Sequence, residues 1–223
     1  DARKRFNPRS LADLEEMVPA MDWEKYFNGI GVPEVDTVII SELKYMEVIQ
    51  NVLEESDVDT WKKYLRWEAI NGAIGMLNQE LEKANWEFYA KDLRGAKKQR
   101  PADERALGTL NGTIGEALGK LYVDRKFPPE AKERAETMIA DVILAFEQRI
   151  NKLDWMSPET KTKAVEKLRS LKVKIAYPDE WKDYTTLDVK GVEEGGTYLQ
   201  NMMNATAWNY NESLEKLGKE VDK

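Results

Sequence analysis

Apolar residues recur along most of the chain at intervals of three and four, the spacing that places side chains on one face of an α-helix. The clearest stripe comprises Ala131, Ala135, Met138, Ile139, Val142, Ile143, Phe146 and Ile150. Similar stripes occupy 45–53, 61–77, 107–121, 164–171 and 199–214. Only 36–40 reads as an extended segment, and it is too short to found a sheet. The pattern predicts an all-α fold, an irregular multi-helix bundle of about seven to nine helices with at most one short extended segment.

Polar and proline residues mark where these helices begin. Ser10 with Asp13 and Ser157 with Pro158 are typical of helix N-termini, and Ser41 is expected to cap the helix over 45–53. Pro101 suits the first turn of the helix over 107–121.

Breaks between helices are marked by proline and glycine. The Pro128-Pro129 pair ends one helix and starts another. Between residues 57 and 93 only Gly72 and Gly75 interrupt the pattern, which predicts one long helix or two in series. Residues 172–188 read as a connector, and 191–196 as a glycine loop before the last helix.

The composition removes several kinds of chemistry. The 223 residues include no histidine and no cysteine, so zinc sites that need either residue, and Ser–His or Cys–His catalysis, are excluded. Carboxylate-only sites for calcium or magnesium, and hydrolysis by paired carboxylates, stay open. A net charge of −7 argues against nucleic acid as a partner. No apolar run approaches the roughly 20 residues of a membrane helix.

Candidate sites are few, and each has a structural interpretation that we favour. The carboxylate pairs Glu15-Glu16, Glu54-Glu55 and Glu193-Glu194 point apart on a helix and fit solvated faces. Asp57-Val58-Asp59-Thr60 begins like a calcium loop but lacks the remaining ligands, so a helix N-cap is expected there.

The glycines give no phosphate-binding motif, and for the basic residues we favour a structural role over anion binding. Gly29-Ile30-Gly31 lacks the third glycine of a dinucleotide loop, and Glu193 and Glu194 would repel a phosphate from the 191–196 loop. The basic cluster Arg94, Lys97, Lys98 and Arg100 is expected to complement a helix C-terminus. Seven dispersed tryptophans are predicted to anchor packing.

Several strings, in a shared order from residue 6 to 222, carry a resemblance to a known family. They include Asn7-Pro8-Arg9-Ser10-Leu11, Asp59-Thr60-Trp61-Lys62-Lys63-Tyr64, Gly115-Glu116-Ala117-Leu118-Gly119-Lys120-Leu121-Tyr122-Val123, Leu153-Asp154-Trp155-Met156-Ser157, Lys174-Ile175-Ala176-Tyr177-Pro178 and Leu217-Gly218-Lys219-Glu220-Val221-Asp222. Together they resemble the N-terminal, non-catalytic region of the neprilysin family of zinc metalloendopeptidases, bacterial oligopeptidases included. Ala176 stands where that family usually has glycine. The absence of cysteine favours a bacterial relative.

The resemblance implies a domain and a role. Residues 1–223 would form a single helical cap-lobe domain of a larger metalloendopeptidase, truncated before its catalytic domain. Because the sequence opens at Asp1 and not at methionine, we expect a trimmed piece. In that family the helical lobe encloses a cavity and limits substrates to peptides, while the catalytic lobe supplies a His-Glu-x-x-His helix and a further glutamate for zinc.

No catalytic or metal-binding residue carries over to this chain, and its substrate-binding residues are unknown from sequence. The expected partners are the catalytic lobe of the same polypeptide and peptide substrates, with zinc in the parent and no cofactor here. The resemblance implies an extracytoplasmic location: periplasmic, cell-envelope or secreted. The chain alone should be inactive. The alternative is a free-standing helical protein-interaction module without enzymatic activity.

Overall fold

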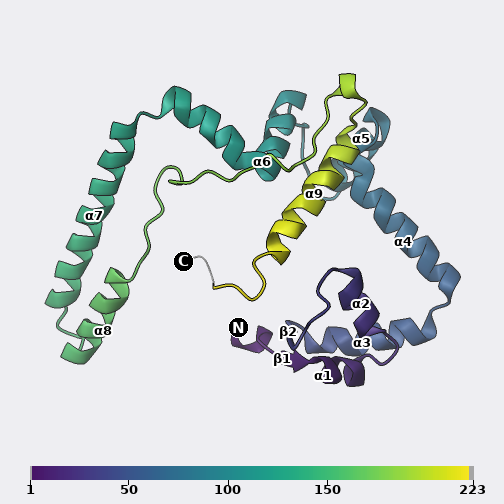
Figure 1. Ribbon diagram of the computed structural model, residues 1–223, viewed down its shortest axis with the longest axis horizontal. Coiled ribbons are helices and arrows are strands. Elements are labelled where there is room, and N and C mark those ends of the chain that lie inside the picture. Colours follow the sequence, from purple (N-terminus) through teal and green to yellow (C-terminus); the bar gives the residue numbers. More distant parts are fainter. Residues whose placement is uncertain (1, 221–223) are drawn as a thin grey trace. The chain divides into compact units, whose positions relative to one another are not determined.

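The computed structural model describes residues 2–220 and is built almost entirely of helices (Figure 1). Its α-helices are α1 (Leu11–Met17), α2 (Trp23–Gly29), α3 (Leu43–Glu55), α4 (Val58–Ala73), α5 (Gln79–Asn85), α6 (Ala102–Lys126), α7 (Pro129–Lys152), α8 (Pro158–Arg169) and α9 (Tyr198–Leu214). The strands are β1 (Pro8–Ser10) and β2 (Thr37–Ile39). Short 3-10 turns occupy Ala2–Arg5, Ile74–Met76 and Val192–Glu194, and a π-helix occupies Trp86–Asp92. The predicted all-α class is confirmed.

Most of the predicted helix starts are confirmed by hydrogen bonds. Ser10 forms a capping box with Asp13: the Asp13 amide donates to Ser10 Oγ, and the Ser10 amide donates to Asp13 Oδ2. Ser157 caps α8, and prolines occupy the first position of α7 and α8. The cap predicted at Ser41 is wrong, because α3 begins one residue later and its N-cap, Glu42, makes no side-chain cap bond.

The stretch from 57 to 93 is broken near its two glycines. Helix α4 ends at Ala73, one residue after Gly72, and the chain tightens into the 3-10 turn that contains Gly75. Helix α5 restarts at an Asn78 cap and widens into the π-helix at Trp86. The prediction of helices in series is therefore confirmed.

The two strands form a small antiparallel ladder that the sequence only half revealed. The predicted extended segment contains β2, whereas its partner β1 carries no strand pattern of its own. Pro8 pairs with Ile39 and Ser10 with Thr37. Asn7 extends the ladder because its side-chain amide donates to the Ile40 carbonyl at 2.8 Å. This pairing ties the N-terminus to the segment before α3.

The described chain divides into two compact units, each treated separately below. The first comprises residues up to Lys97 together with Thr206–Lys219, and the second comprises Lys98–Ala205. The prediction of a single domain over 1–223 stays a prediction. Val221 and Asp222, the end of the last string that carries the resemblance, lie outside the described residues.

The first unit has a small, well-defined apolar core. Its buried members are Leu14, Val18, Trp23, Phe27 and Met46, from α1, α2, α3 and the α1–α2 link. The Trp23 ring stacks on Phe27 with centroids 6.0 Å apart, and its indole N–H donates to the Val18 carbonyl. Helices α1 and α2 are too short to be stable in isolation, so they depend on the packing of their apolar side chains in this core.

The end of α9 completes this unit beside the C-terminus of α2. The Tyr210 hydroxyl donates to the Ile30 carbonyl at 2.6 Å. At Gly31, where φ is +77°, a Cβ atom would lie 3.1 Å from Leu214 Cδ1. Gly31 therefore permits both the left-handed turn and the close approach of α9. The Gly29–Gly31 turn therefore has a packing role.

In the second unit, helix α6 is bent in its middle. Ile114 has φ −127° and ψ 39°, outside the helical region. Two threonines just before it bond back to carbonyls one turn earlier, Thr109 to Arg105 and Thr113 to Thr109. Such back-bonding bends helices, and the flanking glycines offer little resistance. The single helical stripe predicted over 107–121 is thus interrupted.

Helices α7 and α8 form an antiparallel hairpin (Figure 1). Arg169 near the end of α8 makes a two-pronged ion pair with Glu147 of α7. Lys161 donates to the Asn151 carbonyl at the turn. These bonds fix the two helices side by side. They hold only one side of α7.

Replacing Leu14, which is 1% exposed, by alanine is expected to destabilise the chain by about 2–5 kcal/mol, because it leaves a cavity in the first core. Urea unfolding followed by tryptophan fluorescence measures this loss. Leu65→Ala on α4 is the matched control, since Leu65 is 58% exposed and its truncation should change stability little. Equal losses in the two variants would contradict the core assignment.

Candidate functional site

Lys132, near the start of α7, holds the connector 172–188 in place. Its ammonium lies 2.6 Å from Asp179 Oδ1 and donates to the Tyr177 carbonyl at 3.2 Å. It also lies 4.5 Å from the centre of the Tyr177 ring. The Lys132 side chain is 15% exposed, whereas that of Asp179 is 95% exposed. One cation therefore bonds a carboxylate, a carbonyl and an aromatic face of the same short segment.

The hydrogen bond to Asp179 raises the pKa of Lys132 above its ordinary value of 10.5. Because the folded pKa is raised, the stabilisation is complete below the unfolded pKa and is lost only as the pH rises through the folded value. The charge of Lys132 in this contact is consequently constant through neutral pH and is lost in strong alkali.

Aromatic rings extend this contact toward α6. Tyr177 stacks on Trp181 with centroids 5.9 Å apart and meets Phe127 edge-on. Trp181 lies over Gly119 of α6, where an added Cβ would be 3.6 Å from the indole. The Lys182 amide donates to Glu116 on the same helix. The connector is thereby attached to both α6 and α7.

The backbone just before Tyr177 is strained. Ala176 has φ +64° and, among the described residues, is the only residue other than glycine with positive φ. This is the position where the resemblance leads us to expect glycine. The Lys132 and Tyr177 contacts hold the left-handed conformation although alanine disfavours it.

Beside the connector lies an open hollow of about 840 Å³. Ile139 and Ile143 of α7 line it together with Val173 and Ile175 of the connector. Glu116, Glu136 and Glu180 also contribute to its walls. The hollow thus combines apolar side chains with carboxylates and with the ammonium groups of Lys132 and Lys174.

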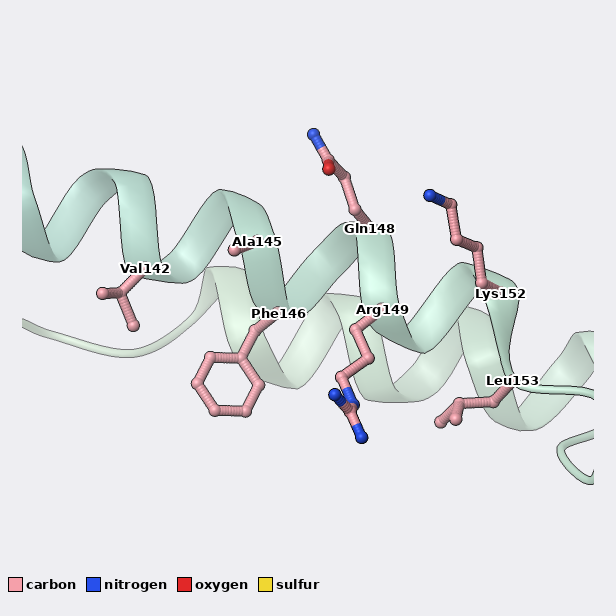
Figure 2. Close-up of a pocket in the computed structure, with 7 residues that line it drawn as sticks. All are labelled: Val142, Ala145, Phe146, Gln148, Arg149, Lys152 and Leu153. Carbon is pink, nitrogen blue, oxygen red and sulfur yellow. The ribbon is translucent and has the colours of Figure 1, made fainter.

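A second hollow, of about 570 Å³, lies along the C-terminal half of α7 (Figure 2). Val142, Phe146, Arg149 and Leu153 form one row of side chains, with Gln148 and Lys152 projecting on the other side and Ala145 between them. Within the described chain, α7 and the residue after it supply the whole lining. It has the shape of a surface groove.

The structure assigns local roles to most of the sequence candidates. Asp57 caps α4 through the Thr60 amide, and that hydrogen bond lowers the pKa of Asp57. The carboxylates of all three predicted pairs lie on exposed residues. Glu194 closes the 3-10 turn by accepting from the Gly191 amide. The N-cap interpretation of Asp57 is confirmed.

The tryptophans and the basic cluster differ in their surroundings. Trp23 is in the core, whereas Trp67 and Trp155 are 52% and 77% exposed. Arg94 and Lys97 are exposed just after the π-helix. Trp155, in the string Leu153–Ser157 that carried much of the resemblance, is thus mostly exposed among the described residues, unlike the packing anchor predicted for it.

Zinc in proteins is held by histidine, cysteine and carboxylate groups. The sequence has neither histidine nor cysteine, and residues 2–220 contain no cluster of three carboxylates placed to hold a metal ion. The donor set of this chain does not fit a zinc centre. In the same described part, no helix has the length and apolar character needed to cross a bilayer.

Residues 1–178 match the sequence model of peptidase family M13 in its N-terminal region. The chain belongs to peptidase family M13. Neprilysin-11 of Caenorhabditis elegans is 26% identical over 98% of the chain, and the neutral endopeptidase of Lactobacillus helveticus is 28% identical over 98%. The chain covers only 27% and 33% of these relatives. The resemblance to the neprilysin family is confirmed.

Solved structures of a bacterial family member have the same fold. The open state of the Mycobacterium tuberculosis zinc metalloprotease Zmp1 superposes with a TM-score of 0.86 at 30% identity. Its inhibitor complex superposes with a TM-score of 0.84 at 29% identity. Each match covers 100% of this chain and about a third of Zmp1, 34% and 33% respectively.

The connector contacts could not be predicted from the sequence. Lys132 and Asp179 are 47 residues apart, and neither stands in a recognisable motif. Ala176 is the exception, because the sequence already shows alanine where the family usually has glycine. That departure coincides with the strained backbone.

Lys132→Met is expected to release the connector, because it removes the cation that bonds Tyr177 and Asp179. Trypsin should then cleave after Lys172 and Lys174 faster than in the parent chain. The control is Lys163→Met on α8, which removes an exposed ion pair with Glu159. Unchanged cleavage in Lys132→Met would show that the cation does not hold this segment.

Ala176→Gly is expected to stabilise the chain by about 1 kcal/mol, since glycine adopts positive φ without the strain that alanine bears. Ala145→Gly, in the interior of α7, should destabilise by about 1 kcal/mol. Urea denaturation of both variants tests the opposite signs. A loss of stability in Ala176→Gly would refute the strain.

Proposed function

We propose that this chain is the non-catalytic helical lobe of a zinc metalloendopeptidase that hydrolyses peptides. The lobe caps the active-site cavity of its parent and limits the size of the substrate. The observation that carries the proposal is the match of 98–100% of this chain to about a third of larger metalloproteases with the same fold. The inferred location is extracytoplasmic.

The lack of donors supports a division of labour within the parent. With no histidine or cysteine in the chain, a His-Glu-x-x-His zinc site belongs to another part of the polypeptide. The role left for a rigid helical lobe is to shape the space that a peptide enters. The Lys132 contacts support this role because they keep a connector ordered that has no regular secondary structure.

Uncovered apolar side chains support packing against more protein. On α4, Tyr64, Leu65, Trp67 and Ile70 are each about half exposed, between 49% and 58%. The Tyr64 and Trp67 rings stack with centroids 6.5 Å apart, and exposed apolar clusters mark interaction faces in soluble proteins. In the proposal this face meets the catalytic lobe of the same polypeptide.

The same apolar surface favours the alternative, a free-standing interaction module. The lobe and the free-standing module predict different coding sequences beyond Lys223. A His-Glu-x-x-His stretch there supports the lobe, and a stop codon supports the module.

Peptide cleavage by the full-length gene product tests the proposed function. A free short peptide should be cleaved much faster than the same target sequence inserted into an unfolded tail of a large carrier protein, because the capped cavity admits only small chains. A zinc chelator should abolish both reactions. The 223-residue chain alone should cleave neither substrate and should not co-purify with equimolar zinc.

Equal cleavage of the two substrates would refute the size-limiting role while leaving the peptidase assignment intact. Equimolar zinc bound tightly by the 223-residue chain would refute its non-catalytic assignment.

A further inference from the structure

Helix α7 carries one wide apolar face, and the described residues cover only part of it. Ile139, Ile143 and Ile150 are half-buried at the edge that bears the connector hollow and lies next to the ion pair to α8. Beside them, Met138, Val142 and Phe146 are 65%, 43% and 55% exposed. The strongest stripe in the sequence is therefore only partly buried within the described chain. A helix with so wide an apolar face is expected to pack against more than one neighbour.

The exposed face has the spacing of a helix-packing seam. Its residues Met138, Val142, Ala145, Arg149 and Lys152 alternate at intervals of four and three. This repeat lets a second helix run along the first at a small crossing angle, with its side chains fitting between those of the seam. Ala145 forms the low point of the groove and gives a neighbouring helix room to approach (Figure 2).

The charge of the groove specifies what its partner should carry. Arg149 and Lys152 lie at one end, and neither forms a salt bridge with any residue from 2 to 220. The nearest carboxylate along the helix, Glu147, is bound to Arg169 of α8. A partner helix with an acidic side chain at this end would complement the two cations.

The covering helix has a source in the proposed parent. In Zmp1 the same fold occurs within a chain of which this region covers about a third. We propose that an α-helix from the same polypeptide, outside residues 1–223, packs along the seam from Met138 to Lys152 and places a carboxylate beside Arg149 and Lys152. This inference rests on the proposed function and specifies where the remainder of the parent docks.

Site-specific photocrosslinking in the full-length gene product tests the seam. A photoreactive phenylalanine analogue replaces Phe146, and mass spectrometry identifies the captured peptide. The expected product is an intramolecular crosslink to a peptide outside residues 1–223 that contains apolar residues at helical spacing and an Asp or Glu. The control places the same probe at Glu133, which is exposed on α7 about 120° around the helix from Ala145.

A crosslink between two copies would overturn the proposal in favour of a dimer seam. Capture within residues 2–220, or no more capture at Phe146 than at Glu133, would also overturn it. A gene product that ends at Lys223 would remove both this inference and the proposed function. If the crosslink fails while the product still cleaves peptides, only the docking of α7 is refuted.

As a second measurement, Phe146→Ser should lower the thermal unfolding midpoint of the full-length product and leave that of the 223-residue chain unchanged. In the proposed arrangement Phe146 is buried only in the larger protein. Equal shifts in both would contradict the seam.

Discussion

An apolar helix face is stable in water only when something covers it, and this constraint governs the whole molecule. The first unit satisfies it locally, with five side chains from neighbouring short segments enclosed in one core. The second unit satisfies it along part of the apolar face of α7, and the rest of that face is exposed. The helices have their own hydrogen bonds, while part of their apolar surface is uncovered within the described chain. This uncovered surface is what the proposed packing against the parent enzyme would bury.

Local chemistry was the part of the fold that the sequence could predict. Ser10, Asp57 and Ser157 cap helices through hydrogen bonds to amides three residues away, so the information lies within one turn. The cap predicted at Ser41 was wrong because the helix begins after Glu42, so Ser41 lies one residue too early to cap it. The Lys132 contacts and the pairing of β1 with β2 depend on residues tens of positions apart, which periodicity does not report.

Family membership accounts for the helical fold of the chain, and its composition excludes sites built on histidine or cysteine. The match to peptidase family M13 covers residues 1–178, and the fold is shared with a third of a zinc metalloprotease. Among the described residues, Lys132 holds a connector, Thr109 and Thr113 bend a helix, and α7 presents a groove. Such a lobe would affect a reaction through what it admits and through what it packs against.

The bend at Ile114 has a consequence for the direction in which α6 presents its residues. Side chains before and after the break differ in angular phase, so one continuous helical run supplies two separate contact directions. A loop at the same place would achieve this too, but it would add residues without helical hydrogen bonds. The bend instead changes the direction of α6 without interrupting the helical run. An insertion of even one residue there would rotate every later side chain of α6 away from its present neighbours.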